Sequence, residues 1–247
     1  MARRVLVALV AGACLAAIVG FQSTRVVKAA SSPRVFVPSP RFYLDLSPSF
    51  RTSIADAYWL YTVQYYGEHL NTDQRFDSLG PMLDLVTSLS PHFRRAYYFG
   101  AFALIDARRP DVSYELLKRG YTANPGDWHF PYYLGFFAYT FGPQGAGARA
   151  AAAWYSKAAE TPGRPDFVPR LAAVLFAKGG EKSKAIAMWA SVYTDGDKYS
   201  RARAVKEIGK LLPAEKQARM KAVAKLRDLM PPVQFDQLVA DLFPGYY

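Results

Sequence analysis

Cysteine and histidine are scarce in this sequence of 247 residues, and their scarcity excludes several kinds of site. The single cysteine, Cys14, lies in an apolar N-terminal stretch, so the chain can form neither an internal disulfide nor a metal centre held by several cysteines. The three histidines are His69, His92 and His129, and none has a second histidine four residues away. A zinc site carried on one helix is therefore not predicted.

Catalytic and cofactor-binding motifs are missing as well. The segment 177–184 (AKGGEKSK) lacks the spacer and the ordered Gly-Lys-Ser of a phosphate-binding loop. The segment 142–147 (GPQGAG) follows no predicted strand, so it does not fit a dinucleotide-binding fold. No Gly-x-Ser-x-Gly elbow occurs, and carboxylates such as Asp84 and Asp106 form no evident pair. We therefore expect no enzymatic activity, no metal and no cofactor.

Acidic residues are few near the C-terminus, and this local imbalance accounts for most of the formal net charge of +11. Residues 198–228 hold ten basic and three acidic side chains, whereas residues 29–197 are close to neutral. Because one segment carries the excess, the overall basic character does not predict nucleic-acid binding.

An uncharged run, Val5–Phe21, follows Arg3 and Arg4. Its length lies between those of a short membrane-spanning helix and a signal-peptide core. An uncleaved anchor at residues 1–30 is the leading interpretation, and a cleaved signal that releases the protein to the periplasm is the alternative. The two arginines favour an internal N-terminus, which predicts a single-pass protein of a bacterial inner membrane with its domain on the periplasmic side. The proline-rich residues 31–53 predict an extended stalk.

Proline closes two similar segments, LVTSLSP at Pro91 and LKRGYTANP at Pro125, which stand 34 residues apart. A third such proline, Pro162, follows after 37 residues, with the excess placed in the turn 142–147. Small residues such as Gly100, Gly135 and Ala173 stand on the first helix of a unit, where the two helices would cross, and the first unit lacks them. The second helices carry matching residues, namely Leu79, Leu83 and Val86; Ser113, Leu117 and Gly120; Ala151, Tyr155 and Ala158; and Ala185, Trp189 and Val192.

This period and these positions resemble the tetratricopeptide repeat, over about residues 54–197 and in four units. The resemblance implies an all-α fold, a right-handed superhelical stack of antiparallel helix pairs. Residues 198–247 depart from the pattern and predict a cap of two basic helices, 199–212 and 214–230, with a short final helix. Such a polar cap covers the exposed end of a stack, and contact with anionic lipid or an acidic partner is the alternative.

The resemblance also implies that the first helix of each unit lines a concave groove for a partner. The alignment places there Trp59, Tyr66, Arg94, Tyr97, His129, Tyr132, Phe136, Tyr139 and Arg170, with Asp56, Val63, Ala101, Leu104, Phe167, Val174 and Lys178 at the remaining positions. So many rings suit an apolar peptide or helix better than an acidic tail. The alternative is that most of these rings pack between helices.

The resulting hypothesis is a non-enzymatic scaffold, tethered to the membrane, that presents an aromatic groove to a protein partner in an envelope assembly such as a pilus or a secretion system. One alternative is an envelope protein that binds glycan or peptidoglycan through its aromatic side chains. Another is a membrane adaptor that faces the cytoplasm. Nucleic acid is not an expected partner.

Overall fold

Helices make up the regular structure of this chain. The computed structural model describes residues 35–46, 48–142 and 146–244, and no β-strand occurs within these ranges. In chain order the helices are α2 (Pro40–Leu46), η1 (Pro48–Phe50), α3 (Arg51–Leu70), α4 (Leu79–Leu89), α5 (Arg94–Asp106), α6 (Pro110–Ala123), α7 (His129–Phe141), α8 (Ala146–Glu160), α9 (Phe167–Lys178), α10 (Lys182–Asp195), α11 (Lys198–Leu211), α12 (Lys216–Ala224), η2 (Arg227–Leu229) and α13 (Pro232–Leu242). The prediction of an all-α class is confirmed for the described residues.

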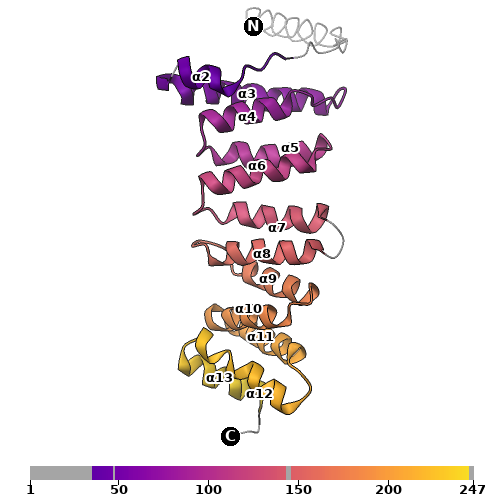
Figure 1. Cartoon of the computed structure of the whole chain (residues 1–247), viewed down its shortest axis with the longest axis vertical. Helices are drawn as coiled ribbons and strands as arrows, with labels where there is room; N and C mark the ends of the chain where they lie inside the picture. Colours follow the sequence, from indigo (N-terminus) through magenta and orange to yellow (C-terminus); the bar gives the residue numbers. More distant parts are fainter. Residues whose placement is uncertain (1–34, 47, 143–145, 245–247) are drawn as a thin grey trace, which may run out of the picture.

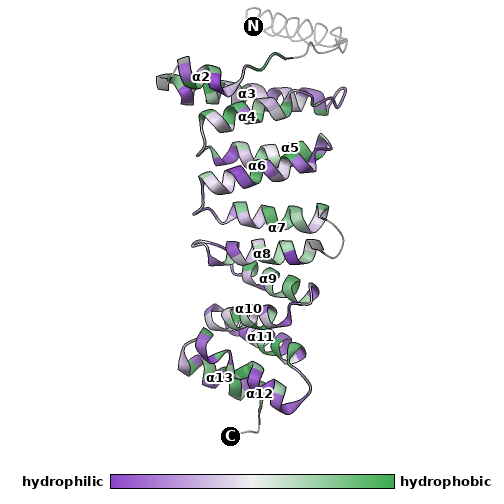
Figure 2. Cartoon of the chain, viewed as in Figure 1, coloured by the Kyte–Doolittle hydropathy of each residue, from purple (hydrophilic) through white to green (hydrophobic). Residues whose placement is uncertain are grey.

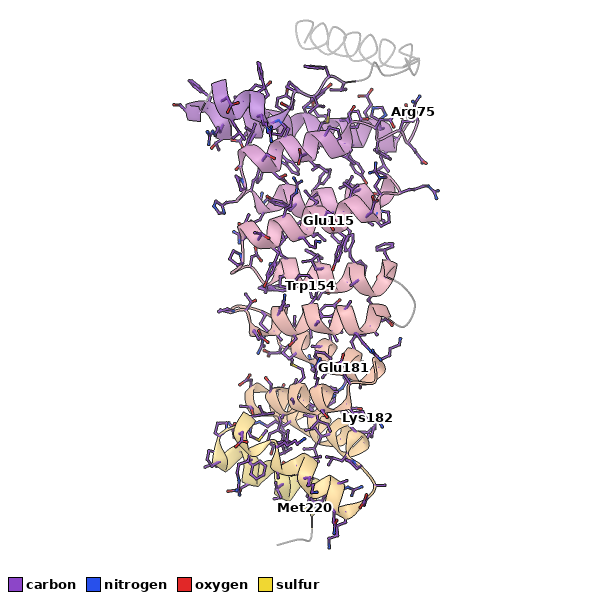
Figure 3. All side chains as sticks on the ribbon, in the orientation of Figure 1. Arg75, Glu115, Trp154, Glu181, Lys182 and Met220 are labelled. Atoms are coloured by element: carbon purple, nitrogen blue, oxygen red, sulfur yellow. The ribbon has the colours of Figure 1, made fainter. Side chains whose placement is uncertain are left out.

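From α3 to α11 each helix packs against the next one in the chain, while α2 packs on α4 and α13 on α11, so the helices form layers along the long axis of the molecule (Figure 1). Hydrophobic and hydrophilic residues are interleaved along the helices (Figure 2), a pattern that lets each helix bury one side and expose the other. Side chains fill the space between layers (Figure 3). Trp154, for example, reaches from α8 to α6, where its Nε1–H donates to Tyr114 Oη at 2.8 Å. This arrangement in adjacent pairs is consistent with a helical solenoid.

Gly100 lies where three helices meet, as the sequence pattern predicts. A Cβ atom on Gly100 would lie 2.7 Å from Leu83 Cδ2 on α4 and 2.9 Å from Leu116 Cδ2 on α6. Ser113 supports the same crossing, because its Oγ–H donates to the carbonyl oxygen of Ala101 at 2.7 Å. Only a residue without a side chain allows α5 to approach both neighbours so closely.

The turns that end α4 and α6 are bonded directly to each other. Asn124 Nδ2 donates to the carbonyl oxygens of Pro91 and Gly120, both at 3.1 Å. The Pro91 turn follows α4, and Asn124 is the C-cap of α6. One amide side chain thus ties the ends of two successive helix pairs, which helps to fix their spacing.

The C-terminal region differs from the prediction. The helix expected at 199–212 is present as α11, and it begins there because Asp197 accepts a hydrogen bond from the Ser200 N–H at 2.8 Å. The single helix expected at 214–230 is instead two pieces, α12 and η2. The break lets Leu226 turn inward, where it is 2% exposed.

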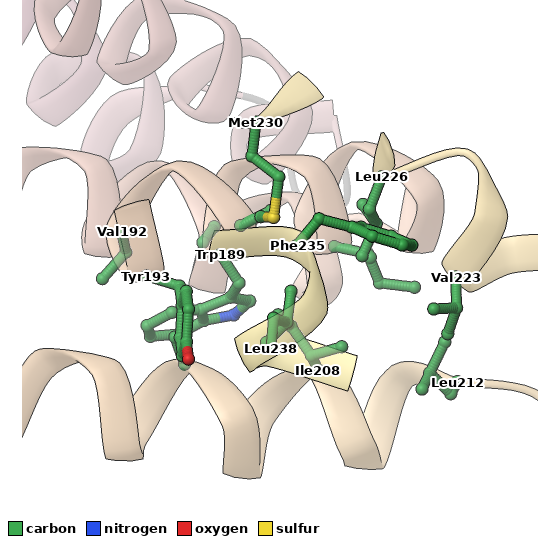
Figure 4. Packing of buried hydrophobic residues seen from close by; sticks show 14 residues of the cluster. Trp189, Val192, Tyr193, Ile208, Leu212, Val223, Leu226, Met230, Phe235 and Leu238 are labelled. Carbon is green, nitrogen blue, oxygen red and sulfur yellow. The ribbon is translucent and has the colours of Figure 1, made fainter. Parts of the chain in front are cut away.

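These C-terminal helices close a hydrophobic cluster of their own rather than covering the stack with polar residues alone. Trp189 and Tyr193 of α10 are each 1% exposed beneath Met230, Phe235 and Leu238 (Figure 4). The hydroxyl of Tyr193 also donates to Asp241 Oδ2 at 2.7 Å. The cap therefore contributes apolar burial as well as charge.

The prediction of an extended stalk at 31–53 is wrong for residues 40–46 and 48–53. This segment forms α2, η1 and the first turn of α3. It packs on the first helix pair, since Tyr43 and Tyr58 share a hydrogen bond at 3.1 Å and Arg51 Nη2 donates to the Leu44 carbonyl oxygen at 3.1 Å. The prolines begin helices here instead of keeping the chain extended.

The assignment to a single-pass inner-membrane protein with a periplasmic domain is contradicted. Across residues 35–46, 48–142 and 146–244, no helix combines the length and the apolar character needed to cross a bilayer. The uncharged run Val5–Phe21, on which the assignment rested, lies outside the described residues.

Candidate partner-binding face

Aromatic side chains connect α3 to α5. The ring of Trp59 meets Phe93 and Phe99 edge to face, with centroids 5.3 Å and 5.2 Å away. Tyr66 also meets Phe99 edge to face at 5.2 Å, and its hydroxyl donates to the carboxylate of Asp106. Burial, with this hydrogen bond, raises the pKa of Tyr66 to about 12, so the phenol remains protonated and able to donate at neutral pH.

The contacts continue from α5 to α7. The ring of Tyr98 lies 5.6 Å from His129 and 5.5 Å from Tyr133. Phe102 meets Tyr133 edge to face at 5.4 Å, yet 43% of Phe102 is exposed. Edge-to-face packing of this kind favours aromatic pairs beyond simple burial, so it holds the exposed rings in place.

Asp127, in the turn before α7, joins α5 to α7 through four hydrogen bonds. Its Oδ2 accepts from Tyr98 Oη at 2.6 Å and from Arg94 Nη1 at 3.0 Å. Its Oδ1 accepts from the His129 N–H at 3.1 Å and lies 2.7 Å from His129 Nδ1. Burial alone would raise the pKa of this carboxyl group, but the hydrogen bonds outweigh burial and lower it below its ordinary value.

Between α7 and α9 the contacts become more polar. Tyr132 meets Phe167 edge to face at 6.0 Å and Tyr155 at 5.4 Å. At the other end of the two helices, Lys178 Nζ donates to Tyr139 Oη at 2.6 Å and lies 5.0 Å from the centre of the same ring. At this end of the two helices the ring of Tyr139 contacts the ammonium group of Lys178, whereas between α5 and α7 rings contact other rings.

Together these side chains form one continuous surface on the first helix of each pair, which we name the odd-helix face. It is defined by Trp59, Val63 and Tyr66 of α3, Arg95, Tyr98, Phe99 and Phe102 of α5, His129, Tyr132, Tyr133, Phe136 and Tyr139 of α7, and Phe167, Arg170, Val174 and Lys178 of α9. Most of the side chains predicted to face a partner lie on it.

The structure differs from the prediction on α5. Tyr97 is 2% exposed and packs on Phe130 in the core, and Ala101 and Leu104 are also buried, so none of the three is available to a partner. The α5 residues that do lie on the face are Arg95, Tyr98, Phe99 and Phe102, which the sequence prediction missed. Arg94 is exposed, but its guanidinium is engaged by Asp127.

The signal that would have found these α5 residues is the 34-residue period itself. Counting back 34 positions from His129, Tyr132 and Phe136 leads to Arg95, Tyr98 and Phe102. The prediction instead placed Arg94 at the position of His129, 35 residues earlier. In the structure each of the two is the first residue of its helix. The turn before α7 is one residue longer than the turn before α5, so this match shifts the whole of α5 by one position.

The remaining predicted residues divide by exposure. Phe136 and Tyr139 are 39% and 45% exposed, whereas Trp59, Tyr66, His129, Tyr132 and Arg170 are half-buried. Half-buried rings both pack on the neighbouring helix and present an edge to solvent. The sequence analysis left open whether these rings face a partner or pack between helices. Being half-buried, the same side chains can do both.

Two cavities lie away from this face. One, of about 460 Å³, is lined by Tyr114, Phe137, Phe141 and neighbours where α6, α7 and α8 meet. The other, of about 480 Å³, is lined by Arg75, Phe76, Arg109 and neighbours at the ends of α4, α5 and α6. Of the residues predicted to contact a partner, the first cavity is lined by none and the second by Leu104 alone, which is buried.

Comparison with known proteins identifies no family for this chain. No protein-family model matches the chain, and no curated protein matches it. Within the described ranges, no three His, Cys, Asp or Glu side chains come together as a group that could hold a metal ion.

Proposed function

We propose that this chain is a tetratricopeptide-like, right-handed helical stack that binds a polypeptide partner on the odd-helix face and catalyses no reaction of its own. The carboxylates next to the face support a scaffold role, because they are used to join helices. Asp106 accepts from Tyr66, and Asp127 accepts from Tyr98, Arg94 and His129.

Support for a true repeat comes from burial. Positions buried in α5 are buried again in α7 after 34 residues and in α9 after a further 38. The matched sets are Ala96, Phe130 and Val168; Gly100, Leu134 and Ala172; Ala101, Gly135 and Ala173; Ala103, Phe137 and Leu175; and Leu104, Ala138 and Phe176. The longer second interval contains the turn at 142–147. Helices that repeat their buried positions in this way repeat their exposed positions too, and so build one surface.

One observation carries the proposal: Phe102 of α5 and Phe136 of α7 occupy equivalent positions on the first helices of successive pairs, and both are exposed. They stand 34 residues apart, 43% and 39% exposed, while Ala103 and Phe137 beside them are each 2% exposed. Large rings held in place at the surface offer contact area with little further loss of conformational entropy on binding. Surface aromatic residues in a row are typical of protein-binding sites.

Selection of peptides tests this proposal. A random-peptide display library is panned over the immobilised full chain, and the Kd values of selected peptides are measured by fluorescence anisotropy. The double substitution Phe102→Ala with Phe136→Ala is expected to raise Kd by about tenfold or more, because each anchoring ring contributes roughly 1–2 kcal/mol.

A matched control replaces two other large, exposed apolar residues by alanine, in a region outside the odd-helix face. Met220 and Leu229, 51% and 56% exposed, lie in the C-terminal helices, and their double replacement by alanine is expected to leave Kd unchanged. Failure to enrich any peptide, or equal losses in both double variants, would contradict the proposal. Retention of the protein on purified peptidoglycan without peptide enrichment would favour the glycan alternative instead.

A further inference from the structure

The repeated burial pattern extends one helix beyond the predicted repeat, onto α11. Ser200, Ala204 and Ile208 are buried, and each stands 32 residues after a buried residue of α9, namely Val168, Ala172 and Phe176. The exposed residues Tyr199, Arg203, Lys206 and Lys210 then correspond to Phe167, Leu171, Val174 and Lys178 of α9. The odd-helix face therefore continues onto α11.

Both α9 and α11 pack on α10, and two observations indicate that they lie near each other. Pro169 of α9 and Ser200 of α11 line the same small cavity. Ala173 of α9 belongs to one hydrophobic cluster with Ala204 and Ile208 of α11.

Three of the four side chains in this extension of the face are cationic. Tyr199, Arg203, Lys206 and Lys210 are spaced so that they lie along one side of α11. Arg203 and Lys206 are exposed, and their charged groups make no hydrogen bond or ion pair with any other described residue. Lys210 is also exposed and pairs with Glu207, with Nζ and Oε1 2.9 Å apart.

Charge thus changes along the face. On α5 and α7 it is largely aromatic, on α9 it carries Arg170 and Lys178 beside Phe167 and Val174, and on α11 it is mainly basic. Asp106, the acidic group at the edge of α5, is already an acceptor for Tyr66. Acidic side chains to balance Arg203 and Lys206 would have to come from a partner.

We propose that the partner is a polypeptide segment with apolar or aromatic side chains at one end, seated on α5 and α7, and Asp or Glu side chains at the other, seated on α9 and α11. This inference rests on the proposed function and specifies its partner. Helix axes in contact lie about 8–10 Å apart, so α5 to α11 spans about 25–30 Å. An extended segment of about nine residues covers that distance.

A single-stranded nucleic acid fits the same surface less well. Such ligands need cations beside each stacking ring, because every base carries a phosphate. Here Arg203 and Lys206 of α11 are two odd-numbered helices away from the exposed ring of Phe136 and three away from that of Phe102. The rings also meet their neighbours edge to face, with Phe102 against Tyr133 at 89° and Phe136 against Phe137 at 75°.

The composition of selected peptides tests the inference. Peptides selected on the wild-type chain are expected to combine Leu, Phe or Trp with at least two Asp or Glu toward one end. Replacing those acidic residues by Asn and Gln in a synthetic peptide is expected to raise Kd roughly fivefold or more, as is the double substitution Arg203→Glu with Lys206→Glu in the protein.

Lys221 of α12 and Lys225, its C-cap, supply the matched control, because both are exposed and their ammonium groups likewise make no hydrogen bond or ion pair with another described residue. Lys221→Glu with Lys225→Glu makes the same change in net charge and is expected to leave Kd within about twofold. Peptides that bind through Phe102 and Phe136 but show no acidic preference would overturn this inference while leaving the proposed function intact. A single-stranded oligonucleotide that binds more tightly than any selected peptide would overturn it too, whereas absence of any enriched peptide would count against the proposed function itself.

Discussion

Replacing Phe130 by alanine is expected to lower the free energy of unfolding by about 3–5 kcal/mol, the usual loss for a fully buried Phe. Phe130 is 0% exposed and lies at the start of α7. Its ring is 5.7 Å from Tyr97 and 4.9 Å from Tyr98, both on α5. Gly120 of α6 is so close that a Cβ atom there would lie 2.2 Å from Phe130 Cε1.

The size of this loss follows from the place of Phe130 in the stack. In a helical repeat each pair is stabilised mainly by its nearest neighbours, so a cavity between α5, α6 and α7 weakens one junction directly. The close approach of Gly120 leaves few other atoms able to fill the space. We expect the urea transition, followed by circular dichroism, to move to lower urea and to broaden as the two halves of the stack become less coupled.

Phe36→Ala is the matched control, because Phe36 is 85% exposed and packs against little. Its free energy of unfolding is expected to stay within about 0.5 kcal/mol of the wild type. A Phe130→Ala protein that unfolds at the same urea concentration as Phe36→Ala would contradict the described junction.

Asp127→Ala is expected to lower the free energy of unfolding by about 2–4 kcal/mol at neutral pH, because hydrogen bonds to a buried carboxylate are among the stronger ones. The Asp127 side chain is 8% exposed, and it accepts from Tyr98, Arg94 and His129. Its removal leaves the Tyr98 hydroxyl without that acceptor in a partly buried site. Asp77→Ala is the control, since Asp77 is exposed and its carboxylate pairs, among the residues that the structure describes, only with Arg75, at 3.4 Å between Nη2 and Oδ2.

The contribution of Asp127 also depends on pH in a defined direction. Its folded pKa is lowered, so its stabilisation is fully present above the unfolded value, about 3.9, and is lost as the pH falls through the lower folded value. The difference in stability between the wild type and Asp127→Ala is therefore expected to be constant near neutral pH and to shrink below about pH 4. A difference that grew on acidification would show that the carboxylate is not held as described.

The sequence predicted the helix pairs well because their boundaries depend on local chemistry. Pro91 and Pro125 cannot continue a helix, and α4 and α6 end two residues before them. Three helices can meet as closely as they do at Gly100 only if the residue there has no side chain, so the glycine in the sequence pattern predicts the crossing. Such signals survive because each helix contacts mainly its sequence neighbours.

Features that depend on contacts across the stack were not predictable in the same way. Whether Tyr97 or Tyr98 faces outward depends on one residue in the preceding turn, and both are tyrosines, so composition does not distinguish them. The helix α2 lies in a proline-rich stretch and is held by packing of Tyr43 on Tyr58 rather than by local propensity. The break between α12 and η2 likewise reflects burial of Leu226 against α10.

The part of α11 in the face shows a further limit of reading charge from sequence. Ten basic residues at 198–228 are spread over α11, α12, η2 and the residues between them, and a count cannot tell which of them share a side. The burial of Ser200, Ala204 and Ile208 separates Arg203 and Lys206 from Lys221 and Lys225. Only then does a surface that changes from aromatic to basic become apparent.

The central claim is that a polypeptide lies on the odd-helix face, and site-specific photocrosslinking measures this most directly. A selected peptide is irradiated with protein that carries p-benzoylphenylalanine in place of Phe136 on α7, or in place of Tyr121 on α6, where the native ring instead meets Trp154 of α8 at 5.5 Å. The account predicts a strong crosslink at position 136 and little at position 121. A stronger crosslink at position 121 would contradict it.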